Sequence, residues 1–338
     1  MTFIILGAGA IGCYIGGRLA STGSTVVMVG RPRTLSGLAA GGLRVSDQEG
    51  FDTHLRPDQL HLCGSLREAL EGLDRNAAPP IVMVCVKGTG TEEVAREIAQ
   101  FCTPASVVIS MQNGIGNAER ILAAAPEMQV HAGMVPYTVM WRNEHHVHRA
   151  NSGVLQVDAS ANTRAMASTM NAAGVPLDLR DDMLAVQWGK LLLNLINPVN
   201  ALADIPIREQ LLQRDYRLVL AALQTEALSV IKAAGIHPAR VAAVAPAMVP
   251  NILRLPNWLF TRIAAGMLKT DPDARTSMCA DLRSGRNTEI DDLCGEVVRL
   301  ARQTGMGAPR NQKMVELVKN YQIGTHWSGA MLRRSLQV

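Results

Sequence analysis

Three polar residues are set into an apolar stretch of the chain, WGKLLLNLINPVN, which covers residues 188–200. They are Lys190, Asn194 and Asn197, and most of the residues between them are leucines. An ammonium group and two amides are unfavourable to bury without partners. On a helix that advances about 100° per residue, all three fall within about 60° of one another. The pattern predicts one polar helix face, which is either an active-site array or the solvent-facing stripe of an amphipathic helix.

A second polar segment, TSMCADLRSGRNTEIDDLCG, covers residues 276–295. Ser277 is expected to cap a helix that ends at SGR, and Thr288 to cap the next one, with Asp291 at the capping-box position. Glu289 then lies in a first helical turn, where the helix dipole favours a carboxylate. Glu289 is therefore either a helix-start residue or a functional acid.

The sequence begins with a motif that is typical of phosphate binding. The apolar run TFIIL (2–6) predicts a strand, GAGAIG (7–12) follows at once, a helix is expected after it, and STVVMVG (24–30) predicts a second strand. This order is the context in which a GxGxxG motif binds a dinucleotide.

Each glycine of that motif has an expected role. Gly7 permits the tight turn, Gly9 lets the backbone approach a pyrophosphate, and Gly12 lets helix and strand pack closely. The amides of Ala10 and Ile11, at the helix start, are expected to bind the phosphates together with the positive end of the helix dipole.

The second strand lacks the acid that usually binds the ribose of NAD. Such an Asp or Glu stands about 20 residues after the glycines, but here Gly30, Arg31, Pro32 and Arg33 follow the strand. A guanidinium pairs well with a phosphate dianion. The segment therefore predicts NADP(H), with Arg31 as the main contact of the 2′-phosphate. The alternative is that both arginines are solvated loop residues.

Two further strands end in polar residues. IVMVCVK (81–87) ends in Lys87, and SVVISMQNGIG (106–116) contains Asn113. In an open α/β sheet, ligands bind at the carboxyl ends of the strands. Lys87 and Asn113 are therefore site candidates, although a surface lysine and an ordinary Asn-Gly turn are the alternatives.

The chain has 338 residues, enough for about two domains. The expected fold class is an α/β N-terminal Rossmann domain with a parallel sheet over residues 1–180, followed by an all-α C-terminal domain over residues 181–338. Helical spacing dominates the second domain, with helices expected at roughly 182–196, 208–234, 238–268 with interruptions, 277–283, 289–304 and 311–320.

Several functions are not expected. The net charge of +4 is spread along the chain without a basic run, so nucleic-acid binding is disfavoured. Six scattered cysteines without a CxxC pair are typical of a reduced, cytoplasmic protein. No stretch reaches the roughly 18 apolar residues of a membrane span. The HHVH segment (145–148) has no cluster of cysteines or carboxylates beside it, so we expect an exposed strand or loop and no metal site.

Taken together, these segments resemble the ketopantoate reductase (2-dehydropantoate 2-reductase) family. The matching segments are LGAGAIG, Arg31, VKGTGTEEV, QNGIG, WGKLLLNLINPVNAL, SMCADLRSGRNTEID and GMGAPRNQKMVELVK. The resemblance implies a Rossmann domain and a helical domain, with NADPH and substrate between them. It also implies NADPH-dependent reduction of a 2-oxo acid, 2-dehydropantoate in pantothenate biosynthesis being the first candidate.

The resemblance also implies roles for single residues. Lys190 matches a catalytic lysine that acts as general acid at the ketone oxygen, and Glu289 matches a carboxylate that works with it. Lys87 matches a lysine that lines the site beside the cofactor. Asn113 matches an asparagine at the nicotinamide end that also contacts substrate. Further substrate contacts are assigned to Asn194, Asn197 and Ser277.

The sequence departs from the family pattern in two places. The usual KxxxNxxxNP is one residue shorter here, and Ala274 stands where an asparagine is usual. A different carbonyl substrate is therefore an alternative. So are a β-hydroxyacid dehydrogenase and a non-catalytic NADP(H) sensor. The apolar C-terminal helices are expected either to form a homodimer interface or to pack within one chain.

Overall fold

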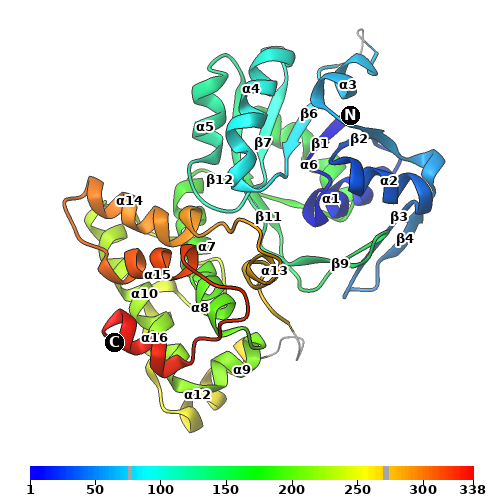
Figure 1. Cartoon of the computed structure of the whole chain (residues 1–338). Coiled ribbons are helices and arrows are strands. Elements are labelled where there is room, and N and C mark those ends of the chain that lie inside the picture. Colours follow the sequence, from blue (N-terminus) through cyan, green and yellow to red (C-terminus); the bar gives the residue numbers. More distant parts are fainter. Residues whose placement is uncertain (75–77, 269–273) are drawn as a thin grey trace. The chain divides into compact units, whose positions relative to one another are not determined.

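The computed structural model describes residues 1–74, 78–268 and 274–338. The chain divides into two compact units, Met1–Met183 and Leu184–Val338. The first unit contains the strands and the second is helical, so the expected fold class is confirmed (Figure 1).

The first unit is built on an eight-stranded sheet with the order β12-β11-β8-β7-β6-β1-β2-β5. Neighbouring strands are parallel except for the antiparallel pair of β8 and β11. The strands are β1 (Thr2–Leu6), β2 (Thr25–Val29), β5 (His61–Cys63), β6 (Ile81–Val84), β7 (Val107–Ser110), β8 (Gln129–Met134), β11 (Leu155–Asp158) and β12 (Leu177–Arg180).

Both faces of this sheet are buried, which explains why its central strands are apolar without interruption. In β1, Phe3 and Ile5 belong to one apolar cluster, whereas Ile4 and Leu6 belong to another. The helices of this unit are α1 (Ala10–Ser21), α2 (Pro32–Gly41), α3 (Leu66–Glu71), α4 (Thr91–Phe101), α5 (Asn117–Ala124) and α6 (Ala161–Ala172). The strand order reverses at β1, and such a switch point is where α/β sheets bind ligands.

A second, four-stranded sheet packs on the other side of α1, with the order β4-β3-β10-β9. Its strands are β3 (Leu43–Asp47), β4 (Asp52–Leu55), β9 (Val139–Asn143) and β10 (His146–Arg149). The HHVH segment thus contributes three of its residues to a strand, and Val147 of that strand is fully buried. The expected strand is therefore confirmed, but its expected exposure is wrong, because β10 lies between two strands and α1 covers it.

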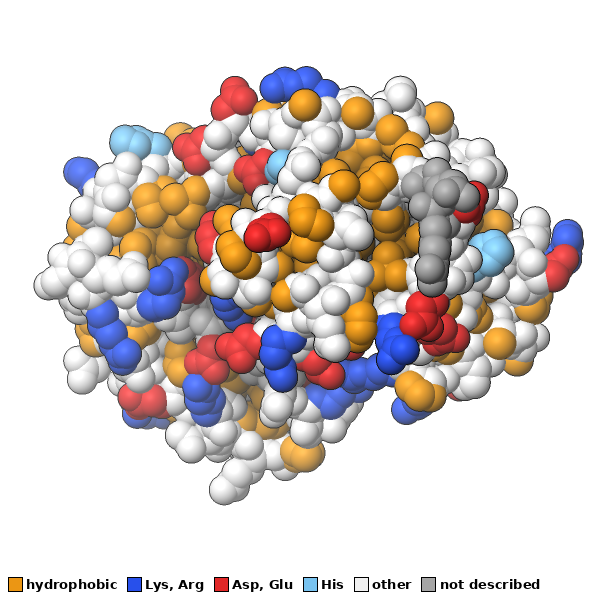
Figure 2. All heavy atoms as spheres, turned by 90° about the horizontal axis from the view of Figure 1, so that it is seen from above, with side chains coloured by type: hydrophobic (Ala, Val, Ile, Leu, Met, Phe, Trp, Pro, Cys, Tyr) orange, Lys and Arg blue, Asp and Glu red, His pale blue; other side chains and the backbone are white. Residues whose placement is uncertain are grey.

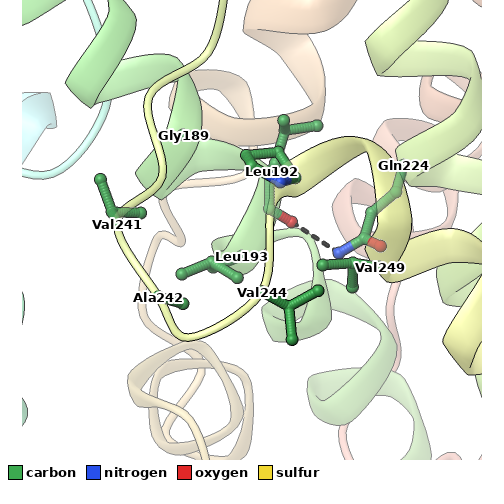
Figure 3. A pocket seen from close by; sticks show the side chains of 9 residues that line it. Gly189, Leu192, Leu193, Gln224, Val241, Ala242, Val244 and Val249 are labelled. Atoms are coloured by element: carbon green, nitrogen blue, oxygen red, sulfur yellow. Dashed lines mark hydrogen bonds between the residues drawn. The ribbon is translucent and has the colours of Figure 1, made fainter.

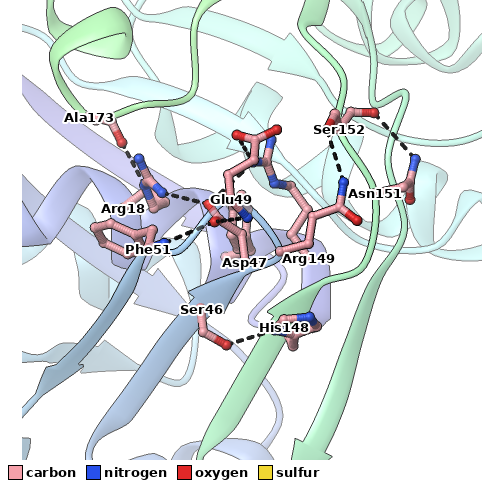
Figure 4. A network of polar contacts seen from close by, with 12 residues as sticks. Arg18, Ser46, Asp47, Glu49, Phe51, His148, Arg149, Asn151, Ser152 and Ala173 are labelled. Atoms are coloured by element: carbon pink, nitrogen blue, oxygen red, sulfur yellow. Dashed lines mark hydrogen bonds and ion pairs between the residues drawn. The ribbon is translucent and has the colours of Figure 1, made fainter.

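A buried carboxylate, Asp47, joins α1 to the four-stranded sheet (Figure 4). Its oxygens accept hydrogen bonds from Arg18 (3.0 Å), Arg149 (3.2 Å) and the Tyr14 hydroxyl (3.2 Å). Burial alone would raise the pKa of Asp47. The backbone amides of Phe51 and Glu49 and the two guanidinium groups outweigh burial and lower that pKa below its ordinary value.

This lowered pKa predicts a specific loss of stability in acid. The native state favours the ionised Asp47, so the stabilisation is complete above the unfolded-state pKa and is lost as the pH falls through the lower native pKa. At pH 7, Asp47→Asn is expected to reduce the free energy of unfolding by about 2 kcal/mol. Urea titrations of both proteins should show this difference shrinking below about pH 4.

The control for that experiment is Asp58→Asn. Asp58 also pairs with an arginine, Arg56, but both side chains are exposed. Its replacement is expected to leave the free energy of unfolding nearly unchanged at every pH, because exposed ion pairs stabilise little. An Asp47→Asn deficit that stays constant from pH 7 to pH 3 would contradict the assignment to Asp47 ionisation.

The second unit packs around its longest helix, α10 (Arg214–Ala233), which contacts most of the others. The remaining helical segments are α7 (Met183–Asn194), α8 (Ile196–Ala203), α9 (Ile207–Leu212), α11 (Val249–Arg254), α12 (Asn257–Ile263), α13 (Ser277–Arg283), the π-helix η5 (Asp291–Gly295), α14 (Glu296–Gln303), α15 (Pro309–Lys319) and α16 (Gly329–Leu336). Within the described residues, no helix is both long and apolar enough to cross a membrane. On the face shown in Figure 2, acidic and basic side chains are interspersed.

Candidate active site

Four loops of the first unit meet at one edge of the large sheet. They follow β2, β1, β6 and β7, which are adjacent and parallel, so their carboxyl ends lie side by side. These loops and the first turn of α1 carry all the cofactor-site residues predicted from the sequence, namely Gly7, Gly9, Ala10, Ile11, Gly12, Arg31, Lys87 and Asn113. The fold therefore brings these residues to one edge.

The fold itself requires two of the three glycines. Gly7 has φ +118°, and a Cβ there would lie 2.7 Å from the backbone nitrogen of Val86. A Cβ on Gly12 would lie 2.2 Å from the Gly7 oxygen and 2.8 Å from Ile5 Cγ2. The tight turn at Gly7 and the close helix–strand packing at Gly12 are thus present as expected.

Gly9 is different, because neither its backbone nor its packing requires glycine. Its φ of −82° suits any residue, it is exposed, and an added Cβ would meet nothing within 4 Å. The amides of Ala10 and Ile11 follow in the first turn of α1, where the helix offers them no acceptor. An open space before free amides at the positive end of a helix fits the pyrophosphate of a dinucleotide.

Arg31 lies one residue beyond the point where β2 meets the glycine loop. A Cβ on Gly30 would be 2.7 Å from Ala8 Cβ, so the two loops are in contact. Arg31 is exposed and makes no side-chain hydrogen bond or ion pair with the residues that the structure describes. Its guanidinium is therefore available to a phosphate, and Arg33 is exposed as well.

Lys87 and Asn113 lie in the loops after β6 and β7, and both are exposed. Lys87 begins the short 3-10 helix η2 (Gly88–Gly90), while Asn113 begins the turn that leads into α5. Since Val84 of β6 pairs with Ser110 of β7, the two loops start from the same level of the sheet.

In the second unit, Lys190 lies in the middle of α7 between buried Trp188 and Leu191. It makes no side-chain hydrogen bond or ion pair with any described residue, and burial lowers its pKa below the ordinary lysine value. A desolvated ammonium without a partner is unfavourable unless it has a task, and such groups gather at functional sites.

The position of α7 is fixed by packing on both sides of Lys190. Gln224 of α10 donates from Nε2 to the Leu192 oxygen at 2.9 Å (Figure 3). A Cβ on Gly189 would lie 2.3 Å from the Ala239 oxygen, so the 239–244 segment touches the helix backbone. The cavity that remains there, about 10 Å³, has room for about one water molecule and none for a substrate.

The helix expected at about 182–196 is present as α7, but the helical segment is interrupted at Leu195, before Asn197. α7 ends at Asn194 and α8 begins at Ile196. Pro198 explains the break, because it has no amide hydrogen to donate to the Asn194 carbonyl and its ring crowds that carbonyl. Lys190 and Asn194 therefore share α7, whereas Asn197 belongs to the next helix, α8.

The structure brings Asn197 close to the start of α13. The Thr276 hydroxyl lies 3.5 Å from the Asn197 oxygen and caps α13 by accepting from the Cys279 amide. Thr276, and not Ser277, is therefore the N-cap, and Ser277 is the first, exposed residue of the helix.

Sequence reasoning missed Asn200, which holds these elements together. It is fully buried, accepts from the Thr276 amide at 3.0 Å and donates to Gln210 at 2.8 Å. The sequence feature that could have revealed Asn200 is an amide side chain in the otherwise apolar segment after Pro198.

Glu289 lies just before a helical segment, but not in its first turn. That segment begins at Asp291, and Ile290 precedes it without a side-chain cap, so the predicted cap at Thr288 is wrong. The reason is a wide π-turn, in which the Gly295 amide bonds back to the Ile290 oxygen. Because Lys190 pairs with no described residue, the structure does not join the Glu289 carboxylate to Lys190.

The first unit has a glycine loop at the switch point of a parallel sheet, and the second unit has a desolvated lysine. This combination defines a dinucleotide-dependent oxidoreductase. Residues 3–162 match the family model described as ketopantoate reductase PanE/ApbA, and residues 182–322 match the model of its C-terminal domain. The chain belongs to the ketopantoate reductase family.

Individual relatives agree with this assignment. The 2-dehydropantoate 2-reductase of Archaeoglobus fulgidus is 27% identical over 95% of this chain and 97% of its own. The crystal structure of a PanE/ApbA family ketopantoate reductase from Ralstonia eutropha is 27% identical, with a TM-score of 0.79 and complete coverage of both chains. D-mandelate dehydrogenase, solved with NADH and anilino(oxo)acetate, shares the fold with a TM-score of 0.75 over both complete chains at 18% identity.

Proposed function

We propose that this protein reduces the carbonyl group of a 2-oxo acid with NADPH, and that 2-dehydropantoate is its substrate. The observation that carries the proposal is the unpaired, desolvated Lys190 in a chain of this family. The name of the Archaeoglobus fulgidus relative supports the choice of substrate.

In this proposal the protein's own residues provide the proton and hold the substrate. NADPH, when bound, supplies the hydride. The Lys190 ammonium stabilises the negative charge that grows on the carbonyl oxygen and donates its proton there. Burial makes that proton easier to release, since it lowers the lysine pKa. From the family resemblance, Glu289 is assigned as the acid that works with Lys190, and the other polar groups as substrate contacts, namely Asn113, Asn194, Asn197 and Ser277.

The fit of NADP(H) rests on the open space at Gly9 and on the free guanidinium of Arg31. We expect Arg31→Ala to weaken NADPH binding about tenfold or more, because a hydrogen bond to a charged group contributes about 1.5–3 kcal/mol. NADH has no 2′-phosphate, so its affinity is expected to stay the same. Fluorescence titration of the two cofactors measures both values.

The control is Arg33→Ala, in which the exposed arginine two residues further on is removed. A smaller loss of NADPH affinity is expected there. Equal losses of NADPH and NADH affinity in Arg31→Ala would contradict recognition of the 2′-phosphate by Arg31.

The function itself is tested by following NADPH consumption with 2-dehydropantoate beside a panel of other 2-oxo acids, with NADH as control. NADPH-selective turnover of 2-dehydropantoate is the expected result. Preferential oxidation of a 3-hydroxy acid would indicate a β-hydroxyacid dehydrogenase instead. Tight NADPH binding without turnover of any carbonyl would indicate a sensor.

One observation favours a different 2-oxo acid as the alternative. Ala274 is held in place by its backbone, whose oxygen accepts from the Ile207 amide at 2.9 Å. A methyl group therefore stands where the family usually has an asparagine, and it cannot donate a hydrogen bond to a substrate hydroxyl. Turnover of an apolar 2-oxo acid in preference to 2-dehydropantoate would support this alternative.

We also propose that the protein is cytoplasmic and forms a homodimer. All six cysteines are free, which suits a reducing compartment. Trp258 and Ile263 of α12 are exposed, at 67% and 55%, and a second copy of the chain could cover them. Light scattering of the purified protein measures the oligomeric state.

A further inference from the structure

A row of polar side chains lies buried beneath the exposed residues Lys87 and Asn113. Its members come from the end of β7, from the loop after it and from the starts of α4 and α5, and none is more than 6% exposed: Ser110, Gln112, Thr91 and Asn117. The mechanism above uses none of them. Buried polar groups in such number are unfavourable unless each finds a partner.

Four hydrogen bonds connect this row, and all four run in the same direction along it. The Ser110 hydroxyl donates to Gln112 Oε1 at 3.0 Å, and Gln112 Nε2 donates to the Thr91 hydroxyl oxygen at 2.8 Å. The Thr91 hydroxyl donates to Asn117 Oδ1 at 2.9 Å. Asn117 Nδ2 completes the row by donating to the backbone oxygen of Asn113 at 2.8 Å. Flipping either amide would place its oxygen against a backbone oxygen, that of Lys87 for Gln112 and that of Asn113 for Asn117, so the row has one stable arrangement.

The row joins the two loops that carry the site candidates. Gln112 Nε2 also lies 3.5 Å from the Lys87 oxygen, so the row reaches the backbone of both loops. Between Asn113 and Asn117 the chain turns back through Gly114 (φ +90°) and Gly116 (φ +80°), conformations that favour glycine. The N-cap of α5 is Gly116, which has no side chain to cap the helix.

We propose that Thr91, Gln112 and Asn117 are positioning residues that hold Asn113 in a fixed relation to Lys87. Thr91 is the central link, since its hydroxyl accepts from one amide and donates to the other. The catalytic consequence rests on the proposed function. The structural consequence, a turn at 113–117 that is rigid only while the row is complete, does not.

The test compares Thr91→Val with Thr91→Ser. Valine keeps the shape of threonine but removes the hydroxyl, whereas serine keeps the hydroxyl. We expect kcat to fall about tenfold or more in Thr91→Val, because small misplacements of a site residue have large effects. Thr91→Ser is expected to stay within about threefold of the wild type. If folded Thr91→Ser is as defective as Thr91→Val, the hydroxyl is not the link and the proposal is wrong.

Thr163→Val is a matched control for the loss of a buried hydroxyl. Thr163 is also fully buried, and its hydroxyl donates to the Asp158 oxygen at 2.7 Å and accepts from the Ser160 amide at 2.9 Å. It follows β11, which runs antiparallel to β8, so it lies at the opposite edge of the sheet. Equal losses of kcat in Thr91→Val and Thr163→Val would mean that removing any buried hydroxyl lowers kcat. That result would contradict a specific role of Thr91.

A readout without cofactor or substrate separates this proposal from the proposed function. Hydrogen–deuterium exchange of the 111–117 peptide should speed up in Thr91→Val and stay at the wild-type rate in Thr91→Ser and Thr163→Val. Unchanged exchange in Thr91→Val overturns the positioning role, whether or not the wild type reduces a 2-oxo acid. If Thr91→Val does not fold, Asn117→Ala, which removes the bond to Asn113, is expected to give the same faster exchange.

Discussion

Lys190→Ala is expected to lower the turnover of the 2-oxo acid at least about 100-fold, while NADPH affinity stays within about twofold. The effect is large because no other ammonium lies on α7, so the variant loses both the proton donor and the positive charge. Steady-state kinetics give kcat, and fluorescence titration gives the NADPH affinity. Exposed Lys232 on α10 is the control, since its replacement with alanine removes the same charge elsewhere in the same unit.

The pH profile adds a second measurement on the same residue. Lys190 must be protonated to act as a general acid, so kcat is expected to fall as the pH rises through its pKa. Burial lowers that pKa, which places the alkaline limb below the range of an exposed lysine, whose ordinary pKa is 10.5. In Lys190→Arg the limb should disappear together with most of the activity, because a guanidinium does not lose its proton. An unchanged limb in that variant would assign the limb to another group.

Gly9→Ala is expected to weaken NADPH binding about tenfold or more without changing the stability of the protein. A Cβ at this position meets no protein atom within 4 Å, and its φ of −82° is ordinary, so the apo protein should tolerate alanine. The methyl group would occupy the space that a pyrophosphate needs and would lengthen its hydrogen bonds to the amides of α1. Thermal unfolding and cofactor titration measure the two effects separately.

Gly12→Ala is the matched comparison, three residues further along the same motif. Its Cβ would lie 2.2 Å from a backbone oxygen, which cannot move without opening the turn at Gly7. We expect this variant to lose about 3 kcal/mol of stability, because overpacking against rigid backbone is unfavourable. If Gly9→Ala is destabilised as much as Gly12→Ala, the open space at Gly9 has a role in the fold and not in binding.

The sequence alone was sufficient wherever neighbouring residues decide the structure. The run TFIIL, the glycines after it and the second apolar run predict strand, turn, helix and strand, and all four are present. Because β1, β2, β6 and β7 are parallel and buried, their ends could also be predicted to share an edge. The absence of an acid after β2 is likewise a local feature, and it directs attention to Arg31.

Regular helical spacing misled where one residue interrupts it or where the helix start depends on distant partners. Pro198 cannot bond back to the Asn194 carbonyl, so α7 ends at Asn194 and Asn197 belongs to a separate helix, α8. Thr276 takes the cap that Ser277 was expected to form, because buried Asn200, 76 residues away in the sequence, holds the Thr276 amide.

Only the tertiary structure decided which glycine is open to a ligand and which polar residues support one another. Gly9 and Gly12 are both glycines of the same sequence motif, and what differs is the set of atoms packed beside each of them. Thr91 and Asn117 are 26 residues apart, and the hydrogen bond between them exists because α4 and α5 start at adjacent loops. Local patterns follow from the periodicity of the backbone, whereas such contacts follow from how the chain is folded back on itself.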